Sequence, residues 1–214
     1  MENKIERHID ILMERYPLLS TCKDEIVRAY NILEKCYRND GKLLVCGNGG
    51  SASDSEHIVG ELMKEFKLKR KVYSSQAAAM KSIDPVLGET LANNLQGALP
   101  AITLTAHSSL TTAYMNDSEP LLVFAQQVNG YGKVGDVFWG ISTSGNSMNV
   151  LYAAVTAKAK GLKVIGLTGK NKNKLDNIAD VCIHVPETET YRIQELHLPV
   201  YHCLCLMLED TFFG

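Results

Sequence analysis

A glycine-rich turn is the first feature of the sequence that could bind a small molecule. The apolar segment 43–46 leads into GNGGS at residues 47–51, and a helical stretch follows. Glycine permits a tight turn and close approach to the backbone, and a helix N-terminus offers unpaired N–H groups to an anion. We therefore expect a cradle for a phosphate or a sugar, with a purely structural turn as the alternative. The turn matches neither a Walker A loop nor the GxGxxG pattern, so no nucleotide is expected.

A second turn is rich in hydroxyl groups. Residues 142–147 read STSGNS, follow the apolar segment 137–141 and precede a helical stretch at 148–160. Hydroxyls and backbone amides at a helix N-terminus can hold a phosphate without a lysine. Helix capping is the alternative, but Ser147 alone would satisfy it. Four hydroxyl side chains in six residues therefore favour phosphate binding.

Imidazole, carboxylate and amide groups occur in two helical stretches that are far apart in the sequence. His57 and Glu61 are four residues apart and share a helix face, and the C-terminal stretch carries Gln194, His197 and His202. Such side chains can ligate Zn²⁺ or another divalent ion. For either group alone, a surface contact or a core histidine is the more common explanation.

Helix geometry constrains the two candidate ligands of the C-terminal stretch. On a straight helix, Gln194 and His202 would lie about 12 Å apart along the axis and about 80° apart around it. To reach one ion, either Pro199 must bend the segment or one ligand must come from another subunit. The second alternative makes the site depend on assembly.

Two helices and five apolar runs must position these groups. Helical spacing of apolar residues predicts one helix before Pro17 and a second before Asn39. The apolar runs occupy residues 43–46, 101–105, 137–141, 164–167 and 181–185. Such runs, separated by helix-length segments, are typical of a parallel sheet buried on both faces, and right-handed crossovers then build a three-layer α/β/α sandwich. Ligands of such sheets gather at the carboxyl ends of the strands.

The 214 residues are predicted to form a single domain, residues 1–214. Residues 1–40 would form an N-terminal helical arm. Residues 66–99 separate the first two strands by more than one helix requires, so we expect an inserted helical or loop excursion. A lid, an oligomer contact or a plain surface insertion would each explain it.

Composition and charge argue against several classes of protein. Hydrophobic residues make up 45% and charged residues 21%, as in globular proteins. The formal charge of −2 argues against nucleic-acid binding, and no apolar run approaches the ~20 residues of a membrane span. Since the N-terminus does not resemble a signal peptide, we expect a cytoplasmic protein. The six cysteines lack CxxC spacing, so we expect reduced thiols rather than disulfides or a thiolate zinc site.

Four sequence blocks, in this order, resemble one family. CGNGGSASDSEHIVGEL, GDVFWGISTSGNSMNVLYAA, KVIGLTGK and YRIQELHLPVYH look like a sugar isomerase (SIS) domain of the phosphoheptose isomerase branch. The resemblance implies a five-stranded, flavodoxin-like sheet and a homotetramer with active sites where subunits meet. It also implies conversion of sedoheptulose 7-phosphate to D-glycero-D-manno-heptose 7-phosphate, with a bound zinc ion.

The resemblance also assigns roles to individual residues. The phosphate would be held by Ser51, Ser142, Thr143, Ser144 and Ser147. The metal ligands would be His57, Glu61, Gln194 and His202. Glu61 and His202 would also form the acid/base pair, and Asp117 and Gln194 would lie near the sugar. To these the glycine turn adds Asn48, Gly49 and Gly50.

An aldose–ketose isomerisation needs groups of these types. Moving a carbonyl from C2 to C1 requires removal of a proton from one carbon, an enediol intermediate, and return of a proton to the neighbouring carbon. Positioned acid and base groups perform these transfers, and a divalent ion can stabilise the developing oxyanion. Which of Glu61 and His202 acts first as the base is left open.

Two departures from the family pattern bear on the substrate. The insertion at 66–99 exceeds that of compact members, and Glu65 stands where the family commonly carries an arginine. A nearby basic residue could supply the missing charge, although a solvated basic stretch is the simpler expectation; the candidates are Lys64, Lys67, Lys69, Arg70 and Lys71. An isomerase of another phosphosugar is therefore a related alternative.

A non-catalytic protein is the alternative from a different functional class. It would be a regulator of a replication initiator with the same fold, or a sensor that binds a phosphosugar without turnover. The regulator lacks counterparts of Glu61 and His202. Their presence here favours the enzyme.

Overall fold

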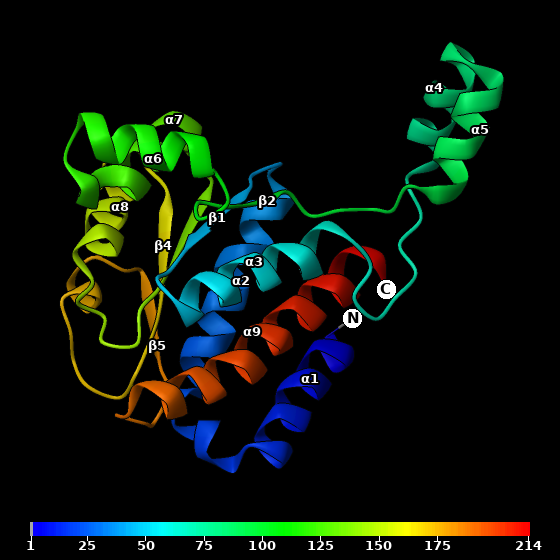
Figure 1. Cartoon of the computed structure of the whole chain (residues 1–214). Helices are drawn as coiled ribbons and strands as arrows, with labels where there is room; N and C mark the ends of the chain where they lie inside the picture. Colours follow the sequence, from blue (N-terminus) through cyan, green and yellow to red (C-terminus); the bar gives the residue numbers. More distant parts are fainter. Residues whose placement is uncertain (1) are drawn as a thin grey trace.

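A parallel sheet of five strands forms the centre of the protein (Figure 1). The computed structural model describes residues 2–214, and side chains from residue 5 onward. The strand order is β2-β1-β3-β4-β5. The strands are β1 (Leu43–Cys46), β2 (Ala101–Thr103), β3 (Val137–Ile141), β4 (Lys163–Thr168) and β5 (Val181–His184). The predicted α/β/α fold is confirmed, and three strands end one or two residues from the predicted bounds.

The central strands are buried on both faces. Every residue of β1 and β3 is buried, and so is every residue of β4 after Lys163. Helices therefore cover the sheet on both sides, as continuous apolar runs require.

Four helices lie on one side of the sheet, where the first in the chain packs mainly against the last. They are α1 (Glu2–Arg15), α2 (Lys23–Arg38), α3 (Gly50–Met63) and α9 (Thr190–Phe213), and a short 3-10 turn, Pro17–Cys22, joins the first two. Leu33 of α2, Ile58 of α3 and Leu204 of α9 belong to one buried cluster that also holds Trp139 of β3. The first forty residues thus contribute directly to the main core.

The opposite face is covered by α7 (Val123–Tyr131) and α8 (Met148–Ala159). Val128 and Val150 pack there against Phe138 of β3. A further helix, α6 (Ser108–Asp117), lies beside α7 (Figure 1). A 3-10 turn at Pro120–Leu122 connects α6 to α7.

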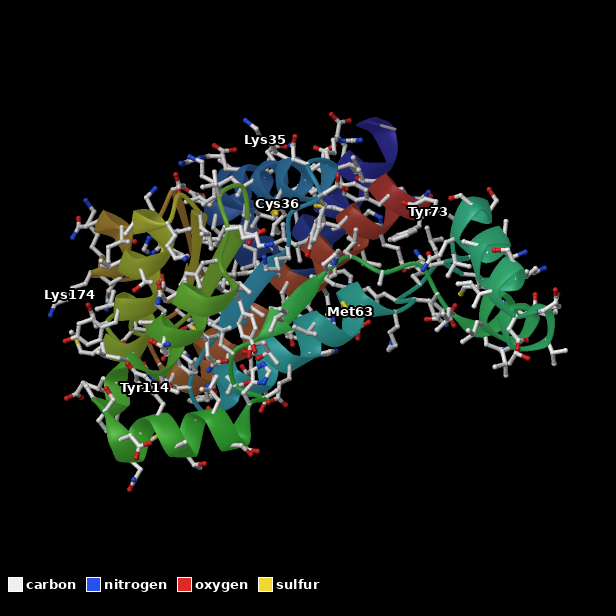
Figure 2. All side chains as sticks on the ribbon, turned by 90° about the horizontal axis from the view of Figure 1, so that it is seen from above. Lys35, Cys36, Met63, Tyr73, Tyr114 and Lys174 are labelled. Atoms are coloured by element: carbon white, nitrogen blue, oxygen red, sulfur yellow. The ribbon has the colours of Figure 1, made fainter. Side chains whose placement is uncertain are left out.

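Residues 66–99 contain a helical hairpin that projects from the body of the protein. Its helices are α4 (Ser74–Ile83) and α5 (Pro85–Asn94), and Figure 2 shows them standing away from the sheet, with Tyr73 at the start of the hairpin. No residue of α4 is buried, and Ile83 is 86% exposed. Asp84 caps α5 by accepting hydrogen bonds from the backbone N–H groups of Val86 and Leu87. The hairpin is therefore locally well formed but leaves apolar side chains in solvent.

Pro199 lies inside α9. It has no N–H group and cannot donate the usual backbone hydrogen bond, yet the helix runs from Thr190 to Phe213. Gln194 and His202 lie on one helix, about 12 Å apart along its axis.

A buried histidine of α9 makes the fold sensitive to acid. His197 is fully buried between α9 and the sheet core. Burial lowers the pKa of His197 from 6.5 to about 4, against a smaller opposing effect of the Thr168 backbone. The folded protein therefore holds this imidazole in its neutral form at pH 7.

We expect the free energy of unfolding to fall as the pH decreases from about 6.5 to about 4. Over this range the unfolded chain protonates His197 and the folded chain does not, which costs at most about 1.4 kcal/mol per pH unit. Urea unfolding of the wild type and of His197→Leu at pH 7 and pH 5 measures this component. Identical pH dependence in the two proteins would contradict the assignment.

Candidate active site

The two turns singled out in the sequence lie side by side at the carboxyl edge of the sheet. β1 and β3 are neighbours, and the strand order reverses between them, since β2 lies beyond β1 and β4 beyond β3. Such a switch point is where open α/β sheets bind ligands. Asn48 and Asn149 exchange two amide hydrogen bonds of 3.0 and 2.8 Å across it. The turn after β1 is thereby fixed to the start of α8.

The glycine turn brings α9 close to the sheet edge. Gly49 has φ +56° at the N-cap of α3, a conformation that favours glycine. A Cβ atom on Gly50 would lie 2.6 Å from Nε2 of Gln194, so the amide reaches the turn only because residue 50 is glycine. Ser51 follows and is buried. Gly50, one of the predicted substrate-binding positions, therefore lies against Gln194.

The hydroxyl turn leaves its serines available to a ligand. Ser147 occupies the N-cap of α8 but makes no capping hydrogen bond with its side chain. Instead its Oγ lies 3.0 Å from Oγ of Ser142. Thr143 is half-buried and Ser144 is exposed. The capping alternative is therefore not supported, and the geometry suits a phosphate at the N-terminus of α8.

The loop after β4 packs against the hydroxyl turn. A Cβ atom on Gly145, whose φ is +62°, would lie 2.1 Å from Cγ of Asn173. The backbone N–H of Leu175 donates to the carbonyl of Gly145 at 3.2 Å. Lys170 and Lys172 of this loop line a cavity of about 200 Å³ shared with the hydroxyl turn. No role for these lysines was predicted from the sequence, although they follow the carboxyl end of a predicted strand.

His57, Glu61 and His202 form a second cluster, where α3 packs against α9. Nε2 of His57 lies 3.0 Å from Oε1 of Glu61, and the rings of His57 and His202 have centroids 5.0 Å apart. Nδ1 of His57 lies 2.9 Å from the hydroxyl of Tyr201, which donates to Asp54 at 3.3 Å. Tyr201 was not singled out from the sequence.

The electrostatics of this cluster suit proton transfer and metal binding. Oε2 of Glu61 and Nε2 of His202 are buried and have no hydrogen-bond partner among the described residues. Burial lowers the pKa of His202, as does the neighbouring His57, while Glu61 acts in the opposite direction. His202 is therefore neutral at pH 7 and can accept a proton or bind a cation. Three of the four predicted metal ligands thus lie in one cluster of this chain, although their ligand atoms do not all come within 4.8 Å of one another.

The fourth predicted ligand, Gln194, lies elsewhere in the same chain. It contacts the glycine turn from near the N-terminal end of α9, whereas His202 lies near the middle of this helix. Ser51 and Glu61 are similarly separated by ten residues of α3, about 15 Å along its axis. One chain therefore presents the substrate turns and the proton-transfer cluster as two separate groups.

Asp117 does not join either group. It is the last residue of α6, is exposed, and accepts a hydrogen bond from the side chain of Asn116 at 2.8 Å. Within the described chain it makes no hydrogen bond to the glycine turn or the hydroxyl turn. Its predicted place near the sugar stays a prediction.

Arg70 is buried, so the expectation of a wholly solvated basic stretch is wrong at this residue. Its Nε donates to Glu209 at 2.8 Å, and its two Nη atoms donate to the carbonyls of Glu61 and Leu62. Arg70 therefore caps the C-terminal end of α3 and cannot supply the charge absent at Glu65. Lys64, whose Nζ lies 3.8 Å from Oε2 of Glu61, is 60% exposed and remains available.

Comparison with known proteins reveals relatives along the whole chain. The family profile described as SIS domain matches residues 12–97 and 74–169. A phosphoheptose isomerase of Rhodospirillum rubrum is 35% identical over 211 residues, covering 99% of this chain and 98% of its own. One of a Nitratiruptor species is 40% identical over 187 residues, covering 87% and 86%. The solved phosphoheptose isomerase of Neisseria gonorrhoeae superposes with a TM-score of 0.70 at 33% identity, covering 95% and 97%.

None of the helices described here combines the length and apolar character that crossing a bilayer requires.

Removing one partner of the Arg70–Glu209 pair is expected to lower the free energy of unfolding by about 3–5 kcal/mol, because the remaining charge stays buried without a counter-charge. Urea unfolding of Arg70→Met and Glu209→Gln measures this. Arg38→Met is the matched control, since Arg38 pairs with Glu34 on the surface of α2, where such pairs contribute about 0.5 kcal/mol. A loss in Arg70→Met no larger than in Arg38→Met would contradict the capping role.

Proposed function

Because the chain belongs to the phosphoheptose isomerases of the SIS-domain family, we propose that it interconverts sedoheptulose 7-phosphate and D-glycero-D-manno-heptose 7-phosphate. The main structural support is a pair of buried atoms in one cluster, Oε2 of Glu61 and Nε2 of His202, which make no hydrogen bond among the described residues. A carboxylate oxygen and an imidazole nitrogen that no hydrogen bond occupies are suited to hold and release protons.

The phosphate would bind at the hydroxyl turn. Ser142, Thr143, Ser144 and Ser147 would donate hydrogen bonds, together with the free N–H groups that begin α8. Ser51 would also contact the phosphate, and the glycine turn would contact the adjoining part of the sugar. Their fixed spacing, held by Asn48 and Asn149, would orient the chain of the substrate.

The reaction needs two proton transfers on neighbouring carbons. A base takes the proton from C1 of the ketose, and the electron pair forms the double bond of a 1,2-enediol as the C2 oxygen gains a proton. Return of a proton to C2 and loss of one from the C1 oxygen give the aldose. We assign the carbon-directed transfers to Glu61 and His202, whose joint position favours this role.

A divalent ion, Zn²⁺ in our proposal, fits the donor set of this cluster. His57, Glu61 and His202 supply imidazole nitrogen and carboxylate oxygen, and two of these donors lack partners in the described chain. When bound, the ion would polarise the carbonyl and stabilise the enediolate oxygen. Gln194 of another subunit would complete the ligand set.

Assembly would bring the two groups of residues together. We propose a homotetramer in which the proton-transfer cluster of one subunit faces the substrate turns of another. The separation of Ser51 from Glu61 along α3 supports this, and so do the exposed apolar side chains of the α4–α5 hairpin. A phosphorylated substrate and six free cysteines favour a cytoplasmic location.

Glu61→Gln and His202→Ala are each expected to lower kcat by about 10²–10⁴-fold, since each removes one positioned proton-transfer group. NMR of the wild type with sedoheptulose 7-phosphate in D₂O should show aldose formation with deuterium in the product. Binding of the phosphosugar, measured by calorimetry, should persist in Glu61→Gln.

The same assay tests the non-catalytic alternatives. Tight binding of phosphosugars with no turnover by the wild type would indicate a sensor. If the protein converts a different ketose phosphate and leaves the heptose phosphate unreacted, the proposed reaction type would stand and the proposed substrate would be wrong.

A mixing experiment tests whether active sites are shared between subunits. Glu61→Gln and the double variant Ser142→Ala/Ser147→Ala are each expected to be nearly inactive. If each site takes its turns and its acid/base pair from different subunits, a 1:1 co-expressed mixture should recover about a quarter of the wild-type activity. Sites built within one chain would recover none, because every chain then carries a defect.

A further inference from the structure

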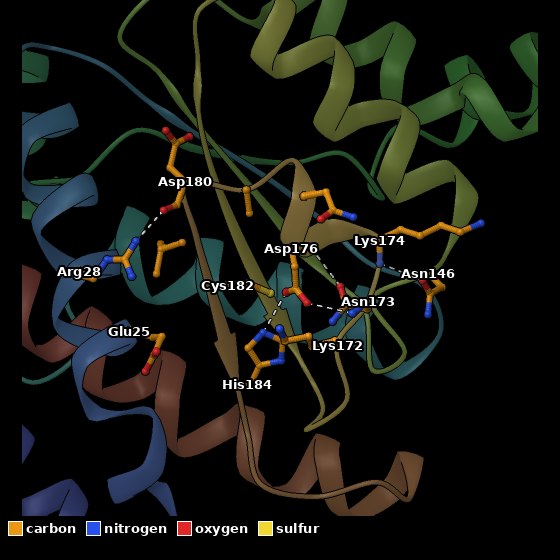
Figure 3. A pocket seen from close by; sticks show the side chains of 13 residues that line it. Glu25, Arg28, Asn146, Lys172, Asn173, Lys174, Asp176, Asp180, Cys182 and His184 are labelled. Carbon is orange, nitrogen blue, oxygen red and sulfur yellow. Dashed lines mark hydrogen bonds and ion pairs between the residues drawn. The ribbon is translucent and has the colours of Figure 1, made fainter.

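Three potential metal ligands outside the candidate active site come together at the β5 edge of the sheet. Asp176 lies in the 3-10 turn Leu175–Asn177, and Cys182 and His184 lie on β5. One ligand atom from each falls within 4.8 Å of the others, a grouping that no other His, Cys, Asp or Glu residues make in the described part of the chain. Figure 3 shows the three side chains directed toward one another at the wall of a cavity.

The strand geometry explains why Cys182 and His184 act together. They are two residues apart on β5, so their side chains project from the same face of the strand. Asp176 then approaches from the preceding loop. Because the motif is Asp-x₅-Cys-x-His rather than CxxC, a search for paired cysteines misses it.

His184 is oriented as metal-binding histidines are. Its Nδ1 lies 3.0 Å from the carbonyl oxygen of Gly169 and 3.2 Å from Oγ1 of Thr168. A carbonyl only accepts, so Nδ1 donates its proton there and Nε2 faces Asp176, where it can bind a cation in the neutral ring. Backbone carbonyls fix the tautomer of metal-bound histidines in the same way.

Asp176 places a carboxylate oxygen beside the imidazole of His184. Its Oδ2 accepts from the backbone N–H of Asn173 at 2.9 Å. Its Oδ1 is buried, makes no hydrogen bond among the described residues, and lies 2.9 Å from Nε2 of His184, with which it forms an ion pair when the imidazole is protonated. A metal ion would take the place of that proton, because metal binding releases the protons of its ligands.

Cys182 is the most accessible thiol of the chain. The other five cysteines are buried, whereas Cys182 is half-buried. Burial, assisted by Asp176, raises the pKa of the Cys182 thiol to about 12. The metal-free protein therefore holds a thiol here, and formation of a metal–sulfur bond releases its proton to solvent.

We propose that Asp176, Cys182 and His184 form a second metal site that takes Zn²⁺ or a similar divalent transition ion. Imidazole, thiolate and carboxylate are the ligands of tetrahedral zinc. Bond lengths near 2.0–2.3 Å set ligand separations of about 3.3–3.6 Å, which small side-chain rotations achieve from the spacing observed. The fourth position faces a cavity of about 700 Å³ and is open to water.

The ion would tie β5 to the loop that supports the hydroxyl turn. Asp176 is adjacent to Leu175, whose N–H binds the carbonyl of Gly145, and Lys174 N–H donates to Oδ1 of Asn146 at 3.0 Å. A bound ion would therefore stabilise this loop. Its binding can be measured without an assay of turnover.

The test uses a His57→Ala/His202→Ala background, which removes the ligands of the proposed catalytic ion. The metal-free protein is titrated with Co²⁺ alone and then with Zn²⁺ as competitor. We expect one ion per chain and a thiolate-to-cobalt charge-transfer absorption in the near ultraviolet. Cys182→Ser should abolish this absorption, and Asp176→Asn should weaken binding at least tenfold. His107→Asn, which changes a half-buried histidine outside both clusters, should bind as the background does.

A second readout follows Cys182 directly. In the background protein, Zn²⁺ should slow the reaction of Cys182 with a thiol reagent. In Asp176→Asn and His184→Asn, Zn²⁺ should not slow this reaction. Circular dichroism confirms that each variant is folded. Cobalt binding without the charge-transfer absorption, or labelling of Cys182 that Zn²⁺ does not slow, would overturn the proposal. Neither readout depends on the isomerase activity.

Discussion

Arg70 and Glu209 form a fully buried ion pair that fixes the end of α3 to α9. The guanidinium also binds the carbonyls of Glu61 and Leu62, and the Glu209 carboxylate accepts the backbone N–H groups of Phe66, Lys67 and Leu68. Each charge is costly to bury without the other, so the two elements must stay together. The backbone of Glu61 is thereby held beside the helix that carries His202, and the geometry of the candidate acid/base pair depends on this contact.

The two ends of α3 consequently have different tasks. Its N-terminal end lies at the carboxyl edge of the sheet, where glycine lets the chain turn and lets Gln194 approach. Its C-terminal end carries Glu61 and is anchored by Arg70. A rigid helix cannot bring these ends to one small molecule, and for this reason we propose that a neighbouring subunit supplies the second group. In that proposal the length of α3 links the isomerase reaction to the oligomeric state.

Much of this architecture could be predicted from the sequence. The strands β1 and β3 were predicted with the bounds observed, because continuous apolar runs have no other place than a sheet covered on both faces. The two ligand turns followed from glycine and hydroxyl residues at strand ends. These signals come from residues close together in the sequence, so they can be recognised without knowledge of the tertiary structure.

The contacts that could not be predicted join residues far apart in the sequence. Arg70 looked like one of several solvated basic residues, and only the packing of α9 reveals Glu209 as its partner. Tyr201 became a partner of His57 because α3 and α9 run side by side. Asp176 meets Cys182 and His184 only after the loop before β5 has folded back. Spacing along the chain carries none of this information.

The α4–α5 hairpin has a consequence for the isolated polypeptide. Ile83, Val86 and Leu87 expose most of their surface and have no core of their own to enter. Apolar surface of this kind promotes self-association, specific or otherwise. If the hairpin is covered only by other copies, protein concentration becomes a determinant of stability, and dilution should populate chains that are prone to aggregate.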